Sequence, residues 1–189
     1  MTVAERAASY SAAFPAYPPL VTHGRWIYGV FEIGNDYRNK SSLYGAYPPR
    51  LLDRIRAIFP EHRPETWLHA FSGSLTREAQ GLRVDLMAER APDVIADVTR
   101  LPLATASRAM TAADPPYSDR DAERYGTPMV DRRKAMRELA RVTKSGGHLS
   151  WLDTVKPMYR NVDWRLFGEI AVVRSTNHRV RMIFLFERV

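Results

Sequence analysis

Two consecutive prolines, Pro115 and Pro116, place the strongest constraint on the fold of this chain. The segment before them, residues 107–112, carries few charges and is suited to a buried strand. Proline has no amide hydrogen to donate to a sheet ladder, so the strand must end at this pair. Asp114 and Tyr117 flank the pair and therefore project from a rigid turn at the carboxyl end of a strand, where open α/β sheets bind their ligands.

The residues alone leave two interpretations of this turn open. In the first, the turn only terminates a strand, with Asp114 as a turn former and the Tyr117 ring packed in the core. In the second, it holds a planar amino group. That group donates hydrogen bonds to Asp114 and to a main-chain carbonyl of the turn, while Tyr117 stacks on the ring that carries the amine. The second interpretation requires that the rest of the chain build a cofactor site facing the turn.

Composition narrows the class of protein. At 189 residues the chain fits one domain with a sizeable core. It contains no cysteine, which excludes disulfides, thiolate metal sites and a cysteine nucleophile acting from this chain. It has no apolar run as long as a membrane span and no apolar signal core near its N-terminus. We therefore expect a cytoplasmic protein of a bacterium or a phage-infected cell, with neither a membrane nor a metal as partner.

The charge balance is compatible with a polyanionic partner. A net charge of +7 and an isoelectric point near 9.9 suit a protein that binds nucleic acid. The basic residues are spread along the chain, with groups at 50–56, 132–134 and 174–181, rather than gathered in one tract. A solvated, arginine-rich surface of the kind that a GC-rich genome encodes explains the same charge, and the sequence does not decide between the two.

The order of the hydrophobic patterns predicts strands that alternate with helices. Strands are expected at 25–33, 66–71, 83–86, 93–98, 107–113 and 148–153, with an antiparallel hairpin at 166–175 and 179–188. Helices are expected to begin at Pro49, near Thr76 and at Asp131. The connections are expected to be an irregular arm at 1–22, a turn at 34–36, a loop at 119–129 and a left-handed helix cap at 144–147. This order predicts an α/β fold whose sheet is mostly parallel, with a C-terminal antiparallel hairpin at its edge and helices on both faces.

Three further strand ends come to the same edge of such a sheet as the Asp114 turn. The first is the turn Phe71-Ser72-Gly73-Ser74, whose glycine lets the backbone approach a ligand closely. Asp85 ends the next strand and is placed to bind ribose hydroxyls, while Asp97 ends the third and is placed to bind an adenine amino group. Each signal is weak alone, but their order and spacing favour a nucleoside-type ligand beside the turn.

With these residues identified, the chain resembles the class I S-adenosylmethionine-dependent methyltransferases. Within that class it is similar to the DNA amino-methyltransferases with an Asp-Pro-Pro-Tyr (DPPY) motif, which make N6-methyladenine or N4-methylcytosine. The resemblance covers about residues 44–189 and implies a Rossmann-like methyltransferase domain there, with S-adenosylmethionine as cofactor. Residues 1–43 are then an N-terminal arm with a short strand, and a separate target-recognition domain is not expected.

The resemblance also assigns roles to particular residues. The catalytic residues are Asp114, Pro115, Pro116 and Tyr117. The cofactor-binding residues are Tyr44, Tyr47 and Pro48 before the first strand of the domain, His69, Phe71, Ser72, Gly73 and Ser74 in the first loop, Asp85 for the ribose, Asp97 and Val98 for the adenine, and Asp114 for the methionine amine. The chain departs from the family at His69, where an acidic residue is usual, and at Leu75, where a second glycine is usual. His69 is equally compatible with a packed core histidine.

The function implied by this resemblance is methyl transfer to an exocyclic amino group of a nucleobase in DNA. Asp114 and the Pro115 carbonyl would hold the amine, and Tyr117 would stack on a base flipped out of the duplex. Two alternatives stay open: the same cofactor with RNA, a protein glutamine or a small amine as acceptor, and a catalytically degenerate nucleic-acid-binding module. We expect a nucleic acid, DNA first, as partner, with a second copy of the chain or a separate specificity protein as sources of sequence selectivity.

Overall fold

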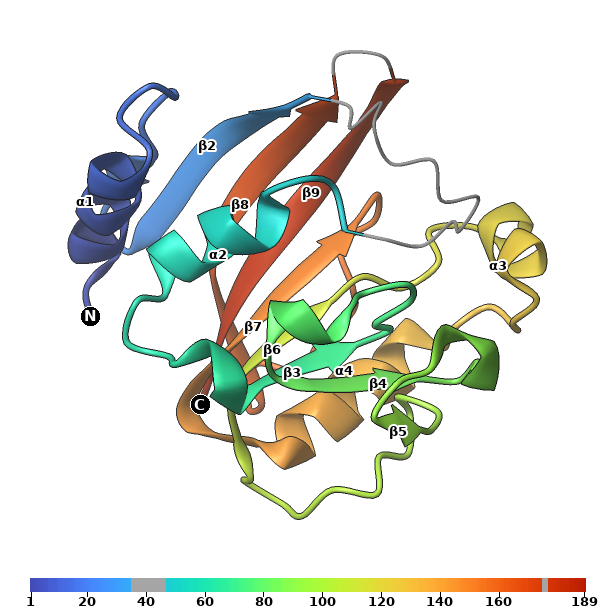
Figure 1. The fold of residues 1–189 in the computed structure, drawn as a ribbon. Helices are drawn as coiled ribbons and strands as arrows, with labels where there is room; N and C mark the ends of the chain where they lie inside the picture. The colour runs from blue at the N-terminus through green and yellow to red at the C-terminus, as the bar shows by residue number, and fades with distance from the viewer. Residues whose placement is uncertain (35–46, 175–176) are drawn as a thin grey trace.

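A mixed β-sheet of nine strands runs through the described part of the chain, which comprises residues 1–34, 47–174 and 177–189 of this computed structural model (Figure 1). The strands are β1 (Val21–His23), β2 (Trp26–Ile33), β3 (Trp67–Ala70), β4 (Leu82–Asp85), β5 (Val94–Ile95), β6 (Arg108–Ala113), β7 (Thr143–Asp153), β8 (Trp164–Arg174) and β9 (Asn177–Arg188). The α-helices are α1 (Val3–Ala13), α2 (Leu51–Ile58), α3 (Asp119–Tyr125) and α4 (Arg132–Val142). Single 3₁₀ turns lie at Pro64–Thr66 (η1), Arg77–Ala79 (η2) and Ala88–Arg90 (η3).

The strand order is β1-β2-β8-β9-β7-β6-β3-β4-β5. Strands β5, β4, β3, β6 and β7 pair in parallel, and β9 runs antiparallel between β7 and β8. This confirms the predicted Rossmann-like sheet with a C-terminal antiparallel hairpin. The hairpin is not at the edge as predicted, because β2 pairs in parallel with β8 and β1 then closes the sheet. Such a pairing joins segments far apart in the sequence and leaves no local signal.

The sheet changes direction at β3, and this places the ligand site. From β3 the chain moves outward to β4 and β5 on one side, and then returns to β6 on the other. The carboxyl ends of β3 and β6 therefore diverge at a switch point, where open α/β sheets form a crevice. The Asp114 turn directly follows β6, so the fold delivers it to this crevice.

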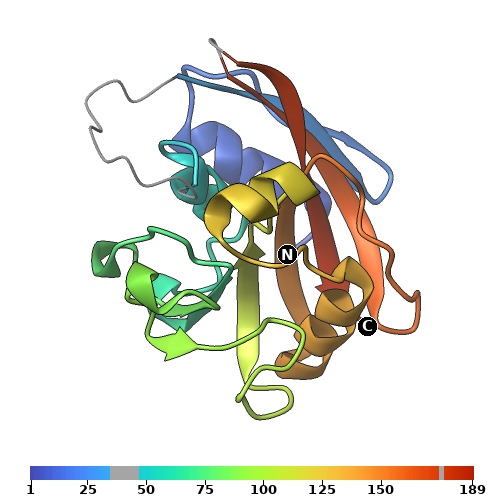
Figure 2. The same ribbon diagram turned by 90° about the vertical axis from the view of Figure 1, so that its right-hand side faces the viewer.

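The two faces of the sheet bury separate apolar clusters. Helices α1 and α2 cover one face and α4 covers the other; Figure 2 shows α1 and α2 next to each other at the upper left and α4 apart from them at the lower right. Successive residues of β9 show the alternation, since Ile183 packs with the first cluster and Phe184 with the second. None of the helices in the described residues has the length and apolar character needed to cross a membrane.

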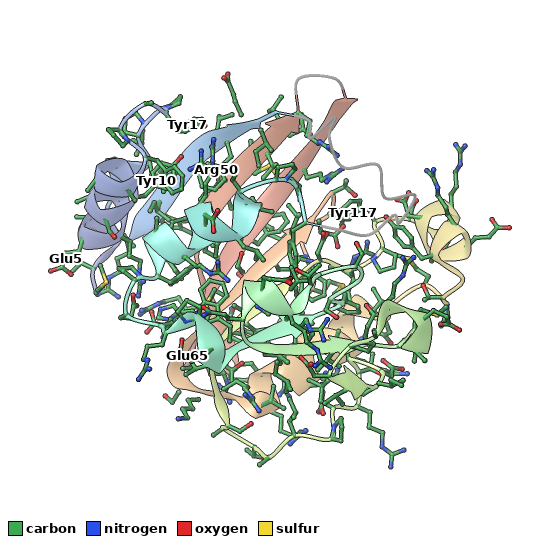
Figure 3. The ribbon with its side chains drawn as sticks, viewed as in Figure 1. Glu5, Tyr10, Tyr17, Arg50, Glu65 and Tyr117 are labelled. Atoms are coloured by element: carbon green, nitrogen blue, oxygen red, sulfur yellow. The ribbon has the colours of Figure 1, made fainter. Side chains whose placement is uncertain are left out.

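The N-terminal segment is ordered, and the prediction of an irregular arm over residues 1–22 was wrong. Thr2 and Glu5 form a capping box at the start of α1: the Thr2 hydroxyl accepts from the Glu5 amide at 3.2 Å, and the Glu5 carboxylate accepts from the Thr2 amide at 2.7 Å. The ring of Tyr10, labelled in Figure 3, is fully buried and stacks on Phe31 of β2 at 5.2 Å. Packing against β2 therefore stabilises a helix whose apolar face is narrow.

Two connections also differ from their prediction. The segment 119–129 was predicted as a loop, but it begins with α3, because the Ser118 hydroxyl accepts from the Asp121 amide and Gly126 ends the helix in the left-handed conformation. The helix expected near Thr76 is only the single turn η2, since Gln80 and Gly81 follow with positive φ.

The glycine-containing segment after α4 does not cap that helix as predicted. Residues 144–147 belong to β7, and Gly146, at φ 71°, lies where the register between β6 and β7 shifts. The predicted turn at 34–36 lies mostly outside the described residues, and the segment 37–46 lies wholly outside them. Of the predicted hairpin turn at 176–178, residue 176 lies outside the described residues, whereas residues 177 and 178 belong to β9.

A buried polar network fixes α1 to the rest of the fold. The Arg6 guanidinium, 3% exposed, donates to the Ile58 carbonyl at 3.0 Å and forms an ion pair with Glu61 at 2.6 Å. Its Nη2 also lies 3.0 Å from His148 Nε2, while His148 Nδ1 lies 2.8 Å from His62 Nε2. Arg6 can only donate, so His148 accepts as a neutral ring with its proton on Nδ1. Glu61, His62 and His148 have the composition of a metal site, but Arg6 already supplies the positive charge among them.

This network predicts a loss of stability in mild acid. Burial, and then the charge of Arg6, lower the pKa of His148 from 6.5 to about 2. Because the unfolded chain protonates His148 first, stability is lost as the pH falls below about 6.5. We expect that, relative to a protein without this histidine, His148 lowers the free energy of unfolding in urea by about 2 kcal/mol between pH 7 and pH 5, at 1.36 kcal/mol per unit of pH below 6.5.

His148→Gln should shrink that difference, whereas His23→Gln, on an exposed strand, should leave it unchanged. An equal pH dependence in His148→Gln and the unaltered protein would contradict the assignment. The comparison between variants is needed because the pKa of Asp114 is raised and acts in the opposite direction.

Candidate active site

A pocket of about 380 Å³ opens at the carboxyl ends of β3, β4 and β6. This size is within the range of small-molecule sites. Its walls come from the loops after β3, β4 and β5, the Asp114 turn, the segment from α3 to the start of α4, and the β8–β9 hairpin. Figure 3 marks Tyr117 between α3 and the upper ends of β8 and β9.

The pocket brings together nine of the residues that the sequence singled out. They are Phe71, Gly73, Asp85, Asp97, Val98, Asp114, Pro115, Pro116 and Tyr117. Ser72, Ser74, Tyr47, Pro48 and His69 do not line it, and Tyr44 lies outside the described residues. The pocket also includes Met87, Arg90 and Tyr125, which carried no recognisable sequence signal. Lys134, Arg174 and Arg181, from the basic groups at 132–134 and 174–181, line it as well, although the sequence did not assign them to this site.

An ion pair between Arg132 and Asp153 supports the Asp114 turn through hydrogen bonds to its backbone carbonyls. Asp153, at the end of β7, is fully buried and binds the Arg132 guanidinium at 2.7 and 3.2 Å. The same guanidinium donates to the carbonyls of Pro116 at 3.4 Å and Tyr117 at 3.1 Å. Arg132 is the first residue of α4, so helix and strand together fix the turn. No local sequence pattern predicts this contact, because its partners are 15 to 21 residues apart.

The carboxyl group of Asp114 titrates near neutral pH. Burial raises its pKa from 3.8 to about 7, although a hydrogen bond from Tyr117 and the charge of Arg181 both oppose the rise. The Tyr117 hydroxyl donates to Oδ1 at 2.5 Å, and burial raises the pKa of that hydroxyl well above its usual value. One carboxyl oxygen is therefore engaged by Tyr117, and a carboxyl that changes charge near pH 7 faces the pocket. Such perturbed groups in clefts are typical of catalytic sites.

The other half of the pocket is organised by Asp85. Its Oδ2 accepts from the Gly73 amide at 2.8 Å and its Oδ1 from the Met87 amide at 2.9 Å, which ties the loops after β3 and β4 together. Phe71 and Gly73 both have positive φ, at 57° and 51°, so the backbone turns sharply there. Asp97 lies two residues beyond the end of β5, and its Oδ1 accepts a hydrogen bond from the Thr99 amide at 2.8 Å.

The third predicted strand, residues 93–98, is shorter than expected. Only Val94 and Ile95 pair with β4, because Asp93 turns away to bind Arg83 through both carboxylate oxygens. Asp97 therefore lies in the loop after β5 instead of ending the strand, but it still reaches the pocket.

His69 lies in the core. Its side chain is fully buried, and its Nε2 lies 2.9 Å from the Gln80 carbonyl, to which it donates as a neutral ring. Burial lowers its pKa to about 4, which keeps it neutral. The cofactor-binding role that the resemblance gave to His69 is therefore replaced by a packing role, since the ring turns toward η2 rather than toward the pocket.

Tyr47 lies close behind the pocket without lining it. Its hydroxyl is buried, and the charges of Asp114 and Asp85 contribute to raising its pKa well above the usual value, after burial itself. No hydrogen-bond partner for this hydroxyl is found among the described residues, and the same holds for the buried Ser72 hydroxyl.

The sheet order, with the pocket at its switch point, defines a Rossmann-like methyltransferase fold. No family model matches the sequence, and no curated protein is significantly similar to it. TrmN from Thermus thermophilus superimposes with a TM-score of 0.58 at 17% identity, covering 77% of this chain and 50% of TrmN. This chain thus spans half the length of that protein.

Two further solved structures are similar to this chain at lower scores. The putative methyltransferase YhhF from Escherichia coli has a TM-score of 0.49 at 14% identity, covering 77% of this chain and 89% of YhhF. The geranyl diphosphate C-methyltransferase from Streptomyces coelicolor A3(2), solved with Mg²⁺, geranyl diphosphate and S-adenosyl-L-homocysteine, has a TM-score of 0.48 at 12% identity, covering 74% of this chain and 80% of that protein. At these identities the likeness is one of fold.

Proposed function

We propose that this protein transfers a methyl group from S-adenosylmethionine to an exocyclic amino group of a nucleobase in DNA, giving N6-methyladenine or N4-methylcytosine. The observation that supports this most is the placement of Asp114 and Tyr117 in one pocket with Asp85 and Asp97. A proton acceptor and a stacking ring thus face two carboxylates suited to a nucleoside. The methyltransferase fold makes S-adenosylmethionine the ligand that best accounts for both halves.

The residues present fit this cofactor. Asp85 keeps lone pairs for ribose hydroxyls beyond those used by Gly73 and Met87, and Asp97 with Val98 would hold the adenine. The unpartnered Tyr47 hydroxyl lies behind the same site, toward Asp114. When bound, the cofactor supplies an electrophilic methyl group on sulfur.

The residues of the turn act on the acceptor. Asp114 Oδ1 is held by Tyr117, so Oδ2 is the oxygen left to accept a hydrogen bond from the amine. That bond favours a pyramidal nitrogen and holds its lone pair in line for transfer. Since the pKa of Asp114 is about 7, the same carboxylate can take the proton that the nitrogen loses. The Tyr117 ring would stack on the base.

The test is transfer of a labelled methyl group to unmodified DNA, followed by digestion and identification of the labelled nucleoside. We expect label in N6-methyldeoxyadenosine or N4-methyldeoxycytidine. Label that appears only in RNA, protein or small-amine fractions would refute DNA as the acceptor and identify the true one. Absence of both label and cofactor binding would refute the methyltransferase proposal and leave a nucleic-acid-binding module.

Asp85→Ala is expected to weaken S-adenosylmethionine binding by about a hundredfold, because it removes the ribose acceptor and also unties the loops after β3 and β4. Calorimetric titration measures this directly. Glu89→Ala, an acidic residue of the neighbouring 3₁₀ turn that does not line the pocket, is the control and should bind as the unaltered protein does. Equal affinity in Asp85→Ala would place the ribose elsewhere.

A further inference from the structure

Two arginines of the β8–β9 hairpin line the same pocket as Asp114. Arg181 of β9 pairs with Val172 of β8, two positions before Arg174, so the two arginines lie near each other across the hairpin. Both side chains reach the pocket. Burial, and then the charge of Arg181, lower the pKa of Arg174.

These two half-buried arginines lack the carboxylate partners that three other arginines of the protein have. Arg6, Arg83 and Arg132 each bind a carboxylate within 3 Å. For Arg174 and Arg181, no carboxylate lies within ion-pair distance among residues 1–34, 47–174 and 177–189, and their Nε atoms are buried without a hydrogen-bond partner there. Partly desolvating a cation without an ion-pair partner is costly, and a bound anion would offset that cost.

The position of Arg181 indicates which anion this is. Its guanidinium carbon lies 5.1 Å from the centre of the Tyr117 ring, the ring on which the acceptor base is proposed to stack. An anion bound there would lie beside the proposed base, which favours an anionic group of the molecule that carries the base. Planar guanidinium groups bind phosphate through two parallel hydrogen bonds. Lys134, which also lines the pocket, adds to the positive charge on this side.

We infer that Arg174 and Arg181 bind a phosphate group of the acceptor, so that the protein takes phosphorylated nucleotides and discriminates against free nucleosides. This inference rests on the proposed function for the position of the base. Arg181 occupies the face of Tyr117 in the free protein. When the base stacks on that ring, the guanidinium leaves it for the phosphate, which couples base entry to phosphate binding.

The test compares the binding of dAMP with deoxyadenosine and of dCMP with deoxycytidine, by equilibrium dialysis with saturating S-adenosylhomocysteine. We expect the preferred nucleotide to bind at least about tenfold more tightly than its nucleoside, and inorganic phosphate to compete. Arg174→Gln and Arg181→Gln should each reduce that ratio severalfold. Arg165→Gln, on β8 but outside the pocket, is the matched control and should keep it. Arg181→Lys keeps the charge and should restore part of the ratio.

Equal binding of nucleotide and nucleoside, or an unchanged ratio in both glutamine variants with unchanged melting temperatures, would overturn the inference. An oligonucleotide that binds more tightly than the mononucleotide, with an affinity that falls with salt, would identify a polynucleotide backbone as the source of the phosphate. Equal affinities would identify a free nucleotide. Because binding is read without methyl transfer, a retained phosphate preference without any transfer would refute the proposed function and not this inference.

Discussion

Asp114→Asn is expected to lower methyl transfer by about a thousandfold or more while leaving S-adenosylmethionine affinity within about tenfold. Asparagine has the same shape and keeps an oxygen for the Tyr117 hydroxyl, but it cannot hold the amine with a charged oxygen or take its proton. The measurement is single-turnover transfer of labelled methyl to the acceptor identified for the unaltered protein, with cofactor affinity from calorimetry.

The same variant is expected to be more stable than the parent. A carboxyl whose pKa rises from 3.8 to about 7 on folding destabilises the ionised folded protein by about 4 kcal/mol. That cost is absent below pH 3.8 and complete above about pH 7, so Asp114→Asn should melt several degrees higher at pH 8 and gain less at pH 5. The parent should also lose transfer activity as the pH falls below about 7, because protonation of Asp114 removes the acceptor oxygen.

Asp119→Asn, an exposed change on α3, serves as the control and should alter neither activity nor stability. An Asp114→Asn protein with full activity would end the proposed mechanism. One that is inactive but less stable at pH 8 than the parent would show that the carboxylate is stabilised in the fold, contrary to its raised pKa.

Arg132→Met is expected to cost about 3 kcal/mol of folding free energy, because it leaves the fully buried Asp153 carboxylate without its cation. It should also lower transfer by about a hundredfold, since the carbonyls of Pro116 and Tyr117 lose the donor that fixes the turn. Urea unfolding and single-turnover transfer measure the two effects.

A second variant separates positioning from stability. Adding Asp153→Asn to Arg132→Met removes the unpaired charge and should recover much of the stability, but not the transfer rate, because the turn still lacks its donor. Arg133→Met, exposed on the same helix, is the matched control. If the double variant regains activity together with stability, Arg132 acts only through folding.

The parts of this fold that the sequence predicted are those that depend on neighbours along the chain. The diproline ends β6 directly after Ala113, and the apolar runs before Phe71 and Asp85 form β3 and β4. The parallel sheet was predicted from an alternation of strands with helices, although in the structure, among the connections from β3 to β7, only the one from β6 to β7 contains α-helices. A local signal for α1 was also present, because Thr2 and Glu5 have the spacing of a capping box. The prediction of an irregular arm over residues 1–22 did not take this signal into account.

The parts that were missed depend on contacts between distant residues. Arg132 and Asp153 become partners only once α4 packs beside β7, and Arg181 meets Tyr117 only once β9 enters the sheet. His69 lies where the family usually has an acidic residue, and the short turn η2 with the Gln80 carbonyl gives its ring a core partner. The position of a residue near a strand end therefore predicts that the residue lies at the ligand-binding edge of the sheet. It does not predict whether its side chain points into the pocket or into the core.

The parallel pairing of β2 with β8 has a mechanical consequence. Seven residue pairs, from Ile27 with Gly168 to Ile33 with Arg174, join β2 to the C-terminal part of β8. The N-terminal segment, residues 1–34, therefore stabilises β8, the strand that carries Arg174. Among the described residues, this segment contributes no side chain to the pocket. A chain shortened to begin after β2 would leave β8 as an unpaired edge strand, which could pair with strands of other molecules and cause aggregation.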